Sequence, residues 1–207
     1  MKEFLFKALV SVIYVIVKVL FPFKAKGREN IPDQGGIILC SNHISLLDPV
    51  FIILTSKRRV YFMAKNELFK NRILAAFFRF CGAFPVDRGK NDSSAIDNAK
   101  QLVVDGKVFG IFVEGTRTKN PDASPGKPKS GAAVVAASTD SDILPVAVTY
   151  KHGRPRLFSR AVVNYGKVIK AEEIKINEIK TSEIKKVKTR IMDEITSLWE
   201  AETKCLK

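Results

Sequence analysis

The chain has 207 residues, which is long enough for one well-buried domain and short for two. With 46% hydrophobic and 27% charged residues, its composition is that of a globular protein and excludes a disordered or fibrous one. The 35 Lys and Arg residues outnumber the 21 Asp and Glu residues, and the net charge of +14 favours a polyanionic partner, either nucleic acid or an anionic membrane.

The N-terminal segment has the pattern of a membrane attachment. Residues 8–17 form an apolar run between Lys7 and Lys18, and a basic cluster follows at Lys24, Lys26 and Arg28. A membrane-spanning helix needs about 20 apolar residues. We therefore expect residues 1–26 to be a helical segment that lies at a membrane surface, with its cations near anionic headgroups. A buried helix packed on the domain and a secretory signal are the alternatives, and no small-x-small cleavage site supports the signal.

Strand and helix patterns alternate along residues 27–207. Apolar runs predict strands at residues 37–40, 59–64, 83–86, 108–113, 143–150 and 161–169. Helical periodicity and capping residues predict helices at residues 48–54, 67–80, 94–104, 130–138 and 182–201. This alternation predicts one α/β domain over residues 27–207, with helices flanking a largely parallel central sheet, because parallel strands need crossover connections.

Polar segments follow three of the predicted strands, where sites in parallel sheets lie. The first segment contains His43 and Asp48, five positions apart. A loop that turns into a helix can bring this carboxylate to the imidazole, which makes a general base. A helix-capping Asp beside an incidental His is the alternative for the same spacing.

The other two segments carry arginines that suit an anion. Arg88 lies within residues 87–90, and Arg117 follows Gly115 and Thr116, which add backbone donors and a hydroxyl. A solvated surface charge is the alternative for each arginine. The chain has no Gly-x-Ser-x-Gly motif to supply a nucleophile for an acyl-enzyme. A base with two phosphate-binding arginines suits direct transfer, in which an acceptor hydroxyl attacks a thioester.

The cysteines and histidines indicate no metal. Cys40, Cys81 and Cys205 are widely spaced without a Cys-x-x-Cys pair, which fits a reduced, cytosolic setting. The chain has only two histidines, His43 and His152, so a zinc site built from His and Cys would be poorly supplied. We expect no structural metal.

Four blocks, in order, resemble the glycerolipid acyltransferase family, which contains the bacterial 1-acylglycerol-3-phosphate acyltransferases. The resemblance covers about residues 27–169. Its blocks are Asn42-His43 through Asp48, which resembles Asn-His-x4-Asp, then residues 82–88, 112–117 and 144–148. In the third block Val113 replaces the usual Pro, so the turn loses a fixed φ. The segment Lys129-Ser130-Gly131-Ala132 resembles the Lys-Gly-Ala helix start that follows the third block.

The resemblance implies a glycerol-3-phosphate acyltransferase-like fold and an O-acyltransferase, with His43 as general base and Asp48 orienting it. It implies that the acceptor is bound by Asn42, Arg88, Glu114, Gly115, Thr116, Arg117 and Lys129. It also implies no bound cofactor, with acyl-CoA or acyl-acyl carrier protein as the acyl donor. We expect transfer to the sn-2 hydroxyl of lysophosphatidic acid, giving phosphatidic acid, at the cytoplasmic face of the cell membrane. Glycerol-3-phosphate or another lysophospholipid is the alternative acceptor.

A basic binding protein without catalysis is the rival interpretation. The chain carries no recognisable nucleic-acid-binding module, and Phe77, Phe78 and Phe80 fall in a predicted helix. These rings are better explained as core or membrane contacts than as platforms for base stacking. We therefore expect an anionic phospholipid surface as the partner, and no nucleic acid.

Overall fold

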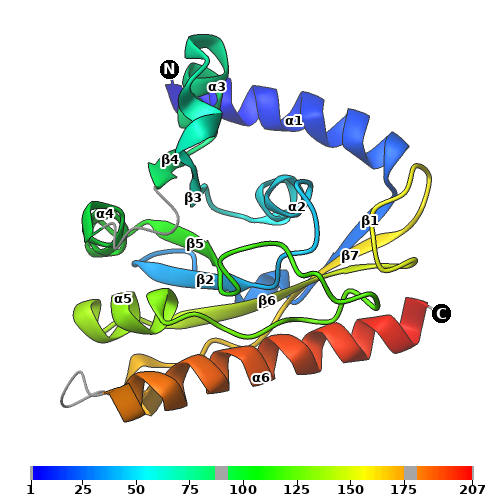
Figure 1. The fold of residues 1–207 in the computed structure, drawn as a ribbon. Helices are drawn as coiled ribbons and strands as arrows, with labels where there is room; N and C mark the ends of the chain where they lie inside the picture. The colour runs from blue at the N-terminus through cyan, green and yellow to red at the C-terminus, as the bar shows by residue number, and fades with distance from the viewer. Residues whose placement is uncertain (1, 87–92, 175–180, 207) are drawn as a thin grey trace.

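The structure is a computed structural model that describes residues 2–86, 93–174 and 181–206. Seven strands form one sheet in the order β1-β7-β6-β2-β5-β3-β4 (Figure 1). Five neighbouring strands are parallel: β6 (Ile143–Tyr150), β2 (Ile37–Ser41), β5 (Val108–Phe112), β3 (Val60–Lys65) and β4 (Ala83–Val86). β7 (Ala161–Tyr165) runs antiparallel to β6, and β1 (Phe23–Lys26) runs parallel to β7. The prediction of a largely parallel α/β sheet is confirmed.

Helices cover both faces of this sheet (Figure 1). On one face lie α1 (Lys2–Leu20) and α2 (Asp48–Thr55). On the other face lie α4 (Ser93–Val104), α5 (Gly131–Thr139) and α6 (Thr181–Leu206). The short α3 (Arg72–Phe80) lies beside the N-terminal part of α1, where the rings of Phe6 and Phe80 meet edge to face at 6.0 Å.

The buried centre of the sheet explains why its strands were recognisable. Every residue of β2 and of β6 is buried, as expected for central strands covered on both faces. Successive side chains of β2 alternate between the two cores: Ile37 and Leu39 pack on the α2 side, whereas Ile38 and Cys40 pack on the α5 side. The strand therefore fixes the direction in which the chain leaves the sheet at Ser41.

The predicted helical segment 1–26 ends earlier than expected. α1 stops at Leu20, and Phe23–Lys26 is the edge strand β1, in which Phe23 pairs with Ala161. The strand has only four residues, and two of them are lysines, so it has no apolar pattern from which a strand could be predicted. Phe23 is nevertheless buried, with its ring between those of Tyr14 and Phe51.

Other boundaries also differ from the predictions. The last helix, α6, extends to Leu206, beyond the predicted end at residue 201. The helix predicted at residues 67–80 is divided into a 3-10 turn, Asn66–Phe69, and α3. The cause is Asn71, whose side chain accepts hydrogen bonds from the backbone of Ile73 and Leu74 and so begins a new helix. The last predicted strand ends at Tyr165, although Ile169 still makes an isolated antiparallel bridge with Ile143.

Candidate active site

His43 and Asp48 meet beyond the carboxyl end of β2. Asp48 begins α2, with Pro49 in the first turn, so the loop between strand and helix folds back on itself. Nδ1 of His43 lies 2.8 Å from Oδ2 of Asp48. The same oxygen accepts the backbone N–H groups of Ile44 at 2.6 Å and Ser45 at 2.7 Å. The carboxylate is fully buried and His43 nearly so, and the structure thus brings the two predicted side chains together.

The sheet also fixes the plane of the His43 ring. Phe112 ends β5, in register with Ser41 of β2, and its ring stacks on the imidazole with centroids 4.0 Å apart and planes 16° apart. Phe62 of β3 stacks in turn on Phe112. With Nδ1 bound to Asp48, Nε2 is the nitrogen left for a substrate, since no described residue hydrogen-bonds to it.

Tyr150 completes the surroundings of Asp48. It is the last residue of β6, and its hydroxyl donates a 2.6 Å hydrogen bond to Oδ1 of Asp48. Desolvation by burial, and then the negative charge of Asp48, raise the pKa of Tyr150 well above its ordinary value, so the hydroxyl stays protonated as a donor. Both oxygens of the carboxylate are therefore engaged, which holds Asp48 in one orientation.

Glu114 supports the loop that carries His43. Its Oε1 accepts the backbone N–H of His43 at 2.8 Å, and its Oε2 accepts that of Gly126 at 3.0 Å. Burial raises the pKa of Glu114, and the two N–H groups oppose this effect. A Cβ atom at Gly126 would lie 2.8 Å from Oε2, so a side chain there would displace the Glu114 carboxylate. The geometry therefore favours a structural role for Glu114 over the predicted contact with the acceptor.

Asn42 also has a structural contact in place of the predicted one. Its Nδ2 donates to the carbonyl of Val148 at 2.9 Å, and its Oδ1 accepts the N–H of Val148 at 2.8 Å. These bonds tie the start of the His43 loop to β6. Asn42 is fully buried and both ends of its amide bond to Val148, so the geometry favours this structural contact over a contact with substrate.

The remaining predicted residues of the third block, and Lys129 after it, lie near the surface. Thr116, Arg117 and Lys129 are exposed, while the N–H of Thr118 donates to the carbonyl of His43 at 2.7 Å. The segment that carries Arg117 is thus bonded directly to the His43 loop. Gly115 has φ of 71°, and a Cβ atom there would lie 2.8 Å from Cδ of Lys129, so glycine permits their close approach. Arg88 lies outside the described residues.

The chain that carries the His43–Asp48 pair is similar to known proteins. Residues 22–149 match the model of the family described as Acyltransferase. The chain belongs to this acyltransferase family. The match spans the His43–Asp48 pair, Glu114, Arg117 and most of β6.

Named relatives of this acyltransferase come from several bacteria. This chain is 34% identical over 185 residues to the 1-acyl-sn-glycerol-3-phosphate acyltransferase of Streptococcus pneumoniae. The match covers 85% of this chain and 68% of that protein. The chain is 28% identical over 157 residues to the Bacillus subtilis enzyme of the same name, covering 75% and 77%. The crystal structure of the 1-acyl-sn-glycerophosphate (LPA) acyltransferase PlsC from Thermotoga maritima has the same fold, with a TM-score of 0.69, 22% identity and coverage of 96% and 84%.

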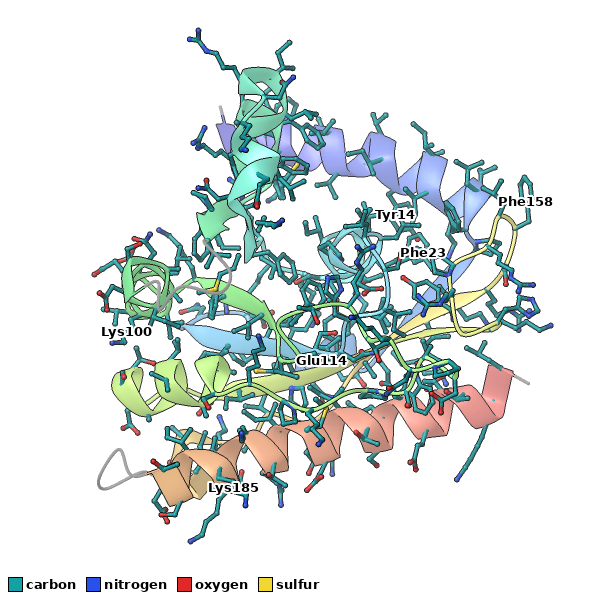
Figure 2. All side chains as sticks on the ribbon, viewed as in Figure 1. Tyr14, Phe23, Lys100, Glu114, Phe158 and Lys185 are labelled. Carbon is teal, nitrogen blue, oxygen red and sulfur yellow. The ribbon has the colours of Figure 1, made fainter. Side chains whose placement is uncertain are left out.

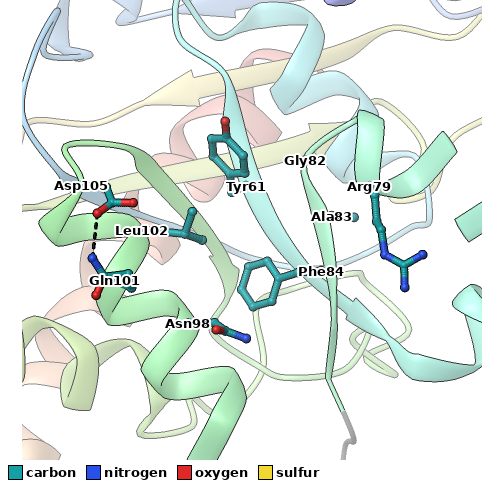
Figure 3. Close-up of a pocket in the computed structure, with 9 residues that line it drawn as sticks. All are labelled: Tyr61, Arg79, Gly82, Ala83, Phe84, Asn98, Gln101, Leu102 and Asp105. Carbon is teal, nitrogen blue, oxygen red and sulfur yellow. Dashed lines mark hydrogen bonds between the residues drawn. The ribbon is translucent and has the colours of Figure 1, made fainter. Parts of the chain in front are cut away.

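A pocket in the acyltransferase lies away from the His43–Asp48 pair. It is a pocket of about 420 Å³, lined by Tyr61, Phe84 and Leu102 together with polar groups of α4 such as Asn98 and Gln101 (Figure 3). Tyr61 and the neighbouring Gly82 lie near the amino ends of β3 and β4, whereas His43 follows the carboxyl end of β2. Because these strands are parallel, the pocket and His43 belong to opposite ends of the sheet.

Tyr150 is a residue of the candidate site that the sequence does not predict. The strand at residues 143–150 was predicted with the correct bounds, so Tyr150 was known to be its last residue. What the pattern lacked was the order of the strands, which sets β6 beside β2 and brings the hydroxyl to Asp48. In the described part of the chain, no three His, Cys, Asp or Glu side chains gather as metal ligands.

Proposed function

We propose that this acyltransferase moves a fatty acyl group from an acyl thioester to the sn-2 hydroxyl of lysophosphatidic acid, forming phosphatidic acid. The observation that carries the proposal is the buried His43–Asp48 pair, with Nε2 of His43 left for a substrate. The names of the bacterial relatives support lysophosphatidic acid as the acceptor.

In the proposed reaction His43 acts as general base. Nε2 takes the proton of the sn-2 hydroxyl while the hydroxyl oxygen attacks the thioester carbonyl carbon. Asp48 stabilises the imidazolium that forms, as its short contact with Nδ1 allows. The tetrahedral intermediate then expels the thiolate, which takes the proton from Nε2. The acceptor supplies the nucleophile, so no acyl-enzyme forms.

Cations near the pair are proposed to hold the acceptor phosphate. Arg117 is exposed, and its loop is bonded to the backbone of His43 through Thr118, which supports a phosphate site close to the base. A guanidinium presents paired N–H donors that suit phosphate oxygens. We assign the same role to Lys129 and Arg88. The net charge of +14 suits either proposed donor, acyl-CoA or the acidic acyl carrier protein.

The surface of α1 supports attachment to a membrane. Val10, Ile13 and Val17 pack on the core, whereas the other side of the helix leaves large apolar side chains exposed, among them Phe4, Leu5, Val12, Val15, Ile16 and Val19. Such a continuous exposed apolar face is unusual for a protein surrounded by water. Within the described residues, no helix has the length and apolar character to cross a bilayer. We propose that α1 lies in the surface of the cytoplasmic leaflet.

An acyl-transfer assay with several acceptors tests the proposal. The purified full chain would be given acyl-CoA or acyl-acyl carrier protein together with lysophosphatidic acid, glycerol-3-phosphate or lysophosphatidylcholine. We expect the highest kcat/KM with lysophosphatidic acid, and phosphatidic acid as the product identified by mass spectrometry. Transfer to glycerol-3-phosphate alone would replace the proposed acceptor. If no acceptor were acylated, the binding-protein interpretation would be favoured instead.

A further inference from the structure

The loop between β6 and β7 has an apolar tip among cations. Leu157 is 61% exposed and Phe158 is 70% exposed. Residues 151–160 include no Asp or Glu, and their four Lys and Arg side chains are all exposed: Lys151, Arg154, Arg156 and Arg160. Apolar groups flanked by cations are the combination that binds the interfacial layer of an anionic bilayer.

The fold holds the tip of this loop in a defined conformation. Phe158 has φ of 58°, a left-handed conformation that is unfavourable for a residue with a Cβ atom. Its N–H donates to the carbonyl of Leu20 at 2.6 Å, and the N–H of Ser159 donates to the carbonyl of Arg156 at 3.1 Å. An unfavourable backbone conformation persists where its surroundings fix it. The surrounding structure therefore holds the side chain of Phe158 in its exposed position.

The tip continues the exposed apolar face of α1. Leu20, whose carbonyl binds Phe158, is the last residue of α1, and Val19 beside it is also exposed. In Figure 1 the β6–β7 loop lies at the C-terminal end of α1, and α3 lies at the N-terminal end of α1. Phe158 lies beside the C-terminal end of α1 (Figure 2). The apolar surface thus extends beyond the helix onto a segment more than 130 residues later in the sequence.

We infer that residues 151–160 form a second membrane contact, in which Leu157 and Phe158 enter an anionic bilayer beside the end of α1. The basic side chains of the loop would bind lipid phosphates around them. The inference rests on the proposed attachment of α1 to the membrane. An acidic acyl carrier protein could also bind the cations, but it would not account for two adjacent apolar side chains in continuity with the exposed face of α1.

Vesicle binding without substrate tests the inference independently of catalysis. The full chain would be sedimented with phosphatidylcholine vesicles that contain or lack phosphatidylglycerol. We expect the double variant Leu157→Glu, Phe158→Glu to bind the anionic vesicles roughly tenfold more weakly than the wild type. Val104→Glu is the control for an added carboxylate elsewhere on the surface, because Val104 is 70% exposed on α4, on the other face of the sheet. It should leave binding unchanged.

A second measurement reports on the position of the tip itself. The chain has a single Trp, Trp199 in α6, so the Phe158→Trp variant can be compared directly with the wild type. We expect the introduced indole to shift its emission to shorter wavelength on anionic vesicles and to be quenched by brominated lipid. If the variant binds the vesicles but its indole shows neither the emission shift nor the quenching, the inference is overturned.

The possible failures are distinguishable. Wild-type binding with an unaffected double variant would overturn the loop contact and leave the attachment by α1 standing. If the wild-type protein did not bind anionic vesicles, both the loop contact and the attachment by α1 would be overturned. If the double variant lost only its use of acyl-acyl carrier protein while its vesicle binding was unchanged, the loop would be a site for that protein instead.

Discussion

The hydroxyl of Tyr150 donates to Oδ1 of Asp48 at 2.6 Å, while Oδ2 of the same carboxylate faces Nδ1 of His43 at 2.8 Å. Tyr150 is buried, so it acts on the proposed reaction through Asp48 without touching a substrate. It is a positioning residue at the end of a strand that is remote in sequence from the proposed base.

Removing this hydroxyl should slow turnover. A hydrogen bond to a charged group contributes about 1.5–3 kcal/mol. We expect Tyr150→Phe to lower kcat about tenfold, which corresponds to about 1.4 kcal/mol of this energy being used to orient Asp48. KM for the acceptor should change little. Steady-state kinetics with varied lysophosphatidic acid measures both values. A raised KM with normal kcat would instead mean that Tyr150 contacts the acceptor.

The proposed base is tested by His43→Ala. General base catalysis contributes about 10²–10⁴-fold to a rate. The rate of acyl transfer should therefore fall by about two orders of magnitude or more. Circular dichroism and vesicle binding should match the wild type. Thr189→Ala is the control, since Thr189 is an exposed residue of α6 that belongs to neither the proposed site nor the proposed membrane contacts. Wild-type turnover by His43→Ala would exclude the proposed mechanism.

Arg117→Ala should weaken use of the acceptor. Loss of one guanidinium contact to phosphate should raise KM for lysophosphatidic acid about tenfold, with a smaller effect on kcat. We expect Arg88→Ala to act in the same direction. Arg190→Ala removes an exposed arginine from α6 and should have no effect on KM. Equal effects of Arg117→Ala and Arg190→Ala would point to loss of overall charge.

Glu114 should give the protein a characteristic dependence of stability on pH. Burial raises its pKa above the ordinary value of 4.5, so between that value and the raised pKa the folded protein binds more protons than the unfolded chain. The contribution of Glu114 to the free energy of unfolding must then fall as pH rises through this window. Urea denaturation of the wild type and Glu114→Gln, between about pH 4 and 7, measures the difference. A difference in favour of the wild type that grows with pH would contradict the prediction.

Gly115→Ala should affect both stability and acceptor use. Its left-handed φ of 71° costs an alanine about 1 kcal/mol, and the new Cβ would meet Lys129 at 2.8 Å. Gly35→Ala is a close control, because Gly35 has φ of 79° with no atom near its Cβ position. We expect both variants to lower the free energy of unfolding and only Gly115→Ala to raise KM for the acceptor. A normal KM would separate Lys129 from the proposed phosphate site.

The sequence predicted what local patterns determine. His43 and Asp48 are brought together by one strand-to-helix loop, so their spacing was informative. Strands β4 and β6 had the expected bounds because each is an apolar run between turns. The partners of Asn42 and Glu114 are backbone groups of distant residues, Val148 and Gly126, and no local pattern indicates such bonds. For the same reason Tyr150 was missed.

Lys151, the first residue of the β6–β7 loop, follows Tyr150 directly. A loop seated among lipid headgroups would therefore be joined by one peptide bond to the residue that steadies Asp48. The height of the imidazole above the bilayer would then be set mainly by covalent geometry and by the rigidity of β6. That height would determine how far a lysolipid must rise out of its leaflet for its hydroxyl to reach Nε2.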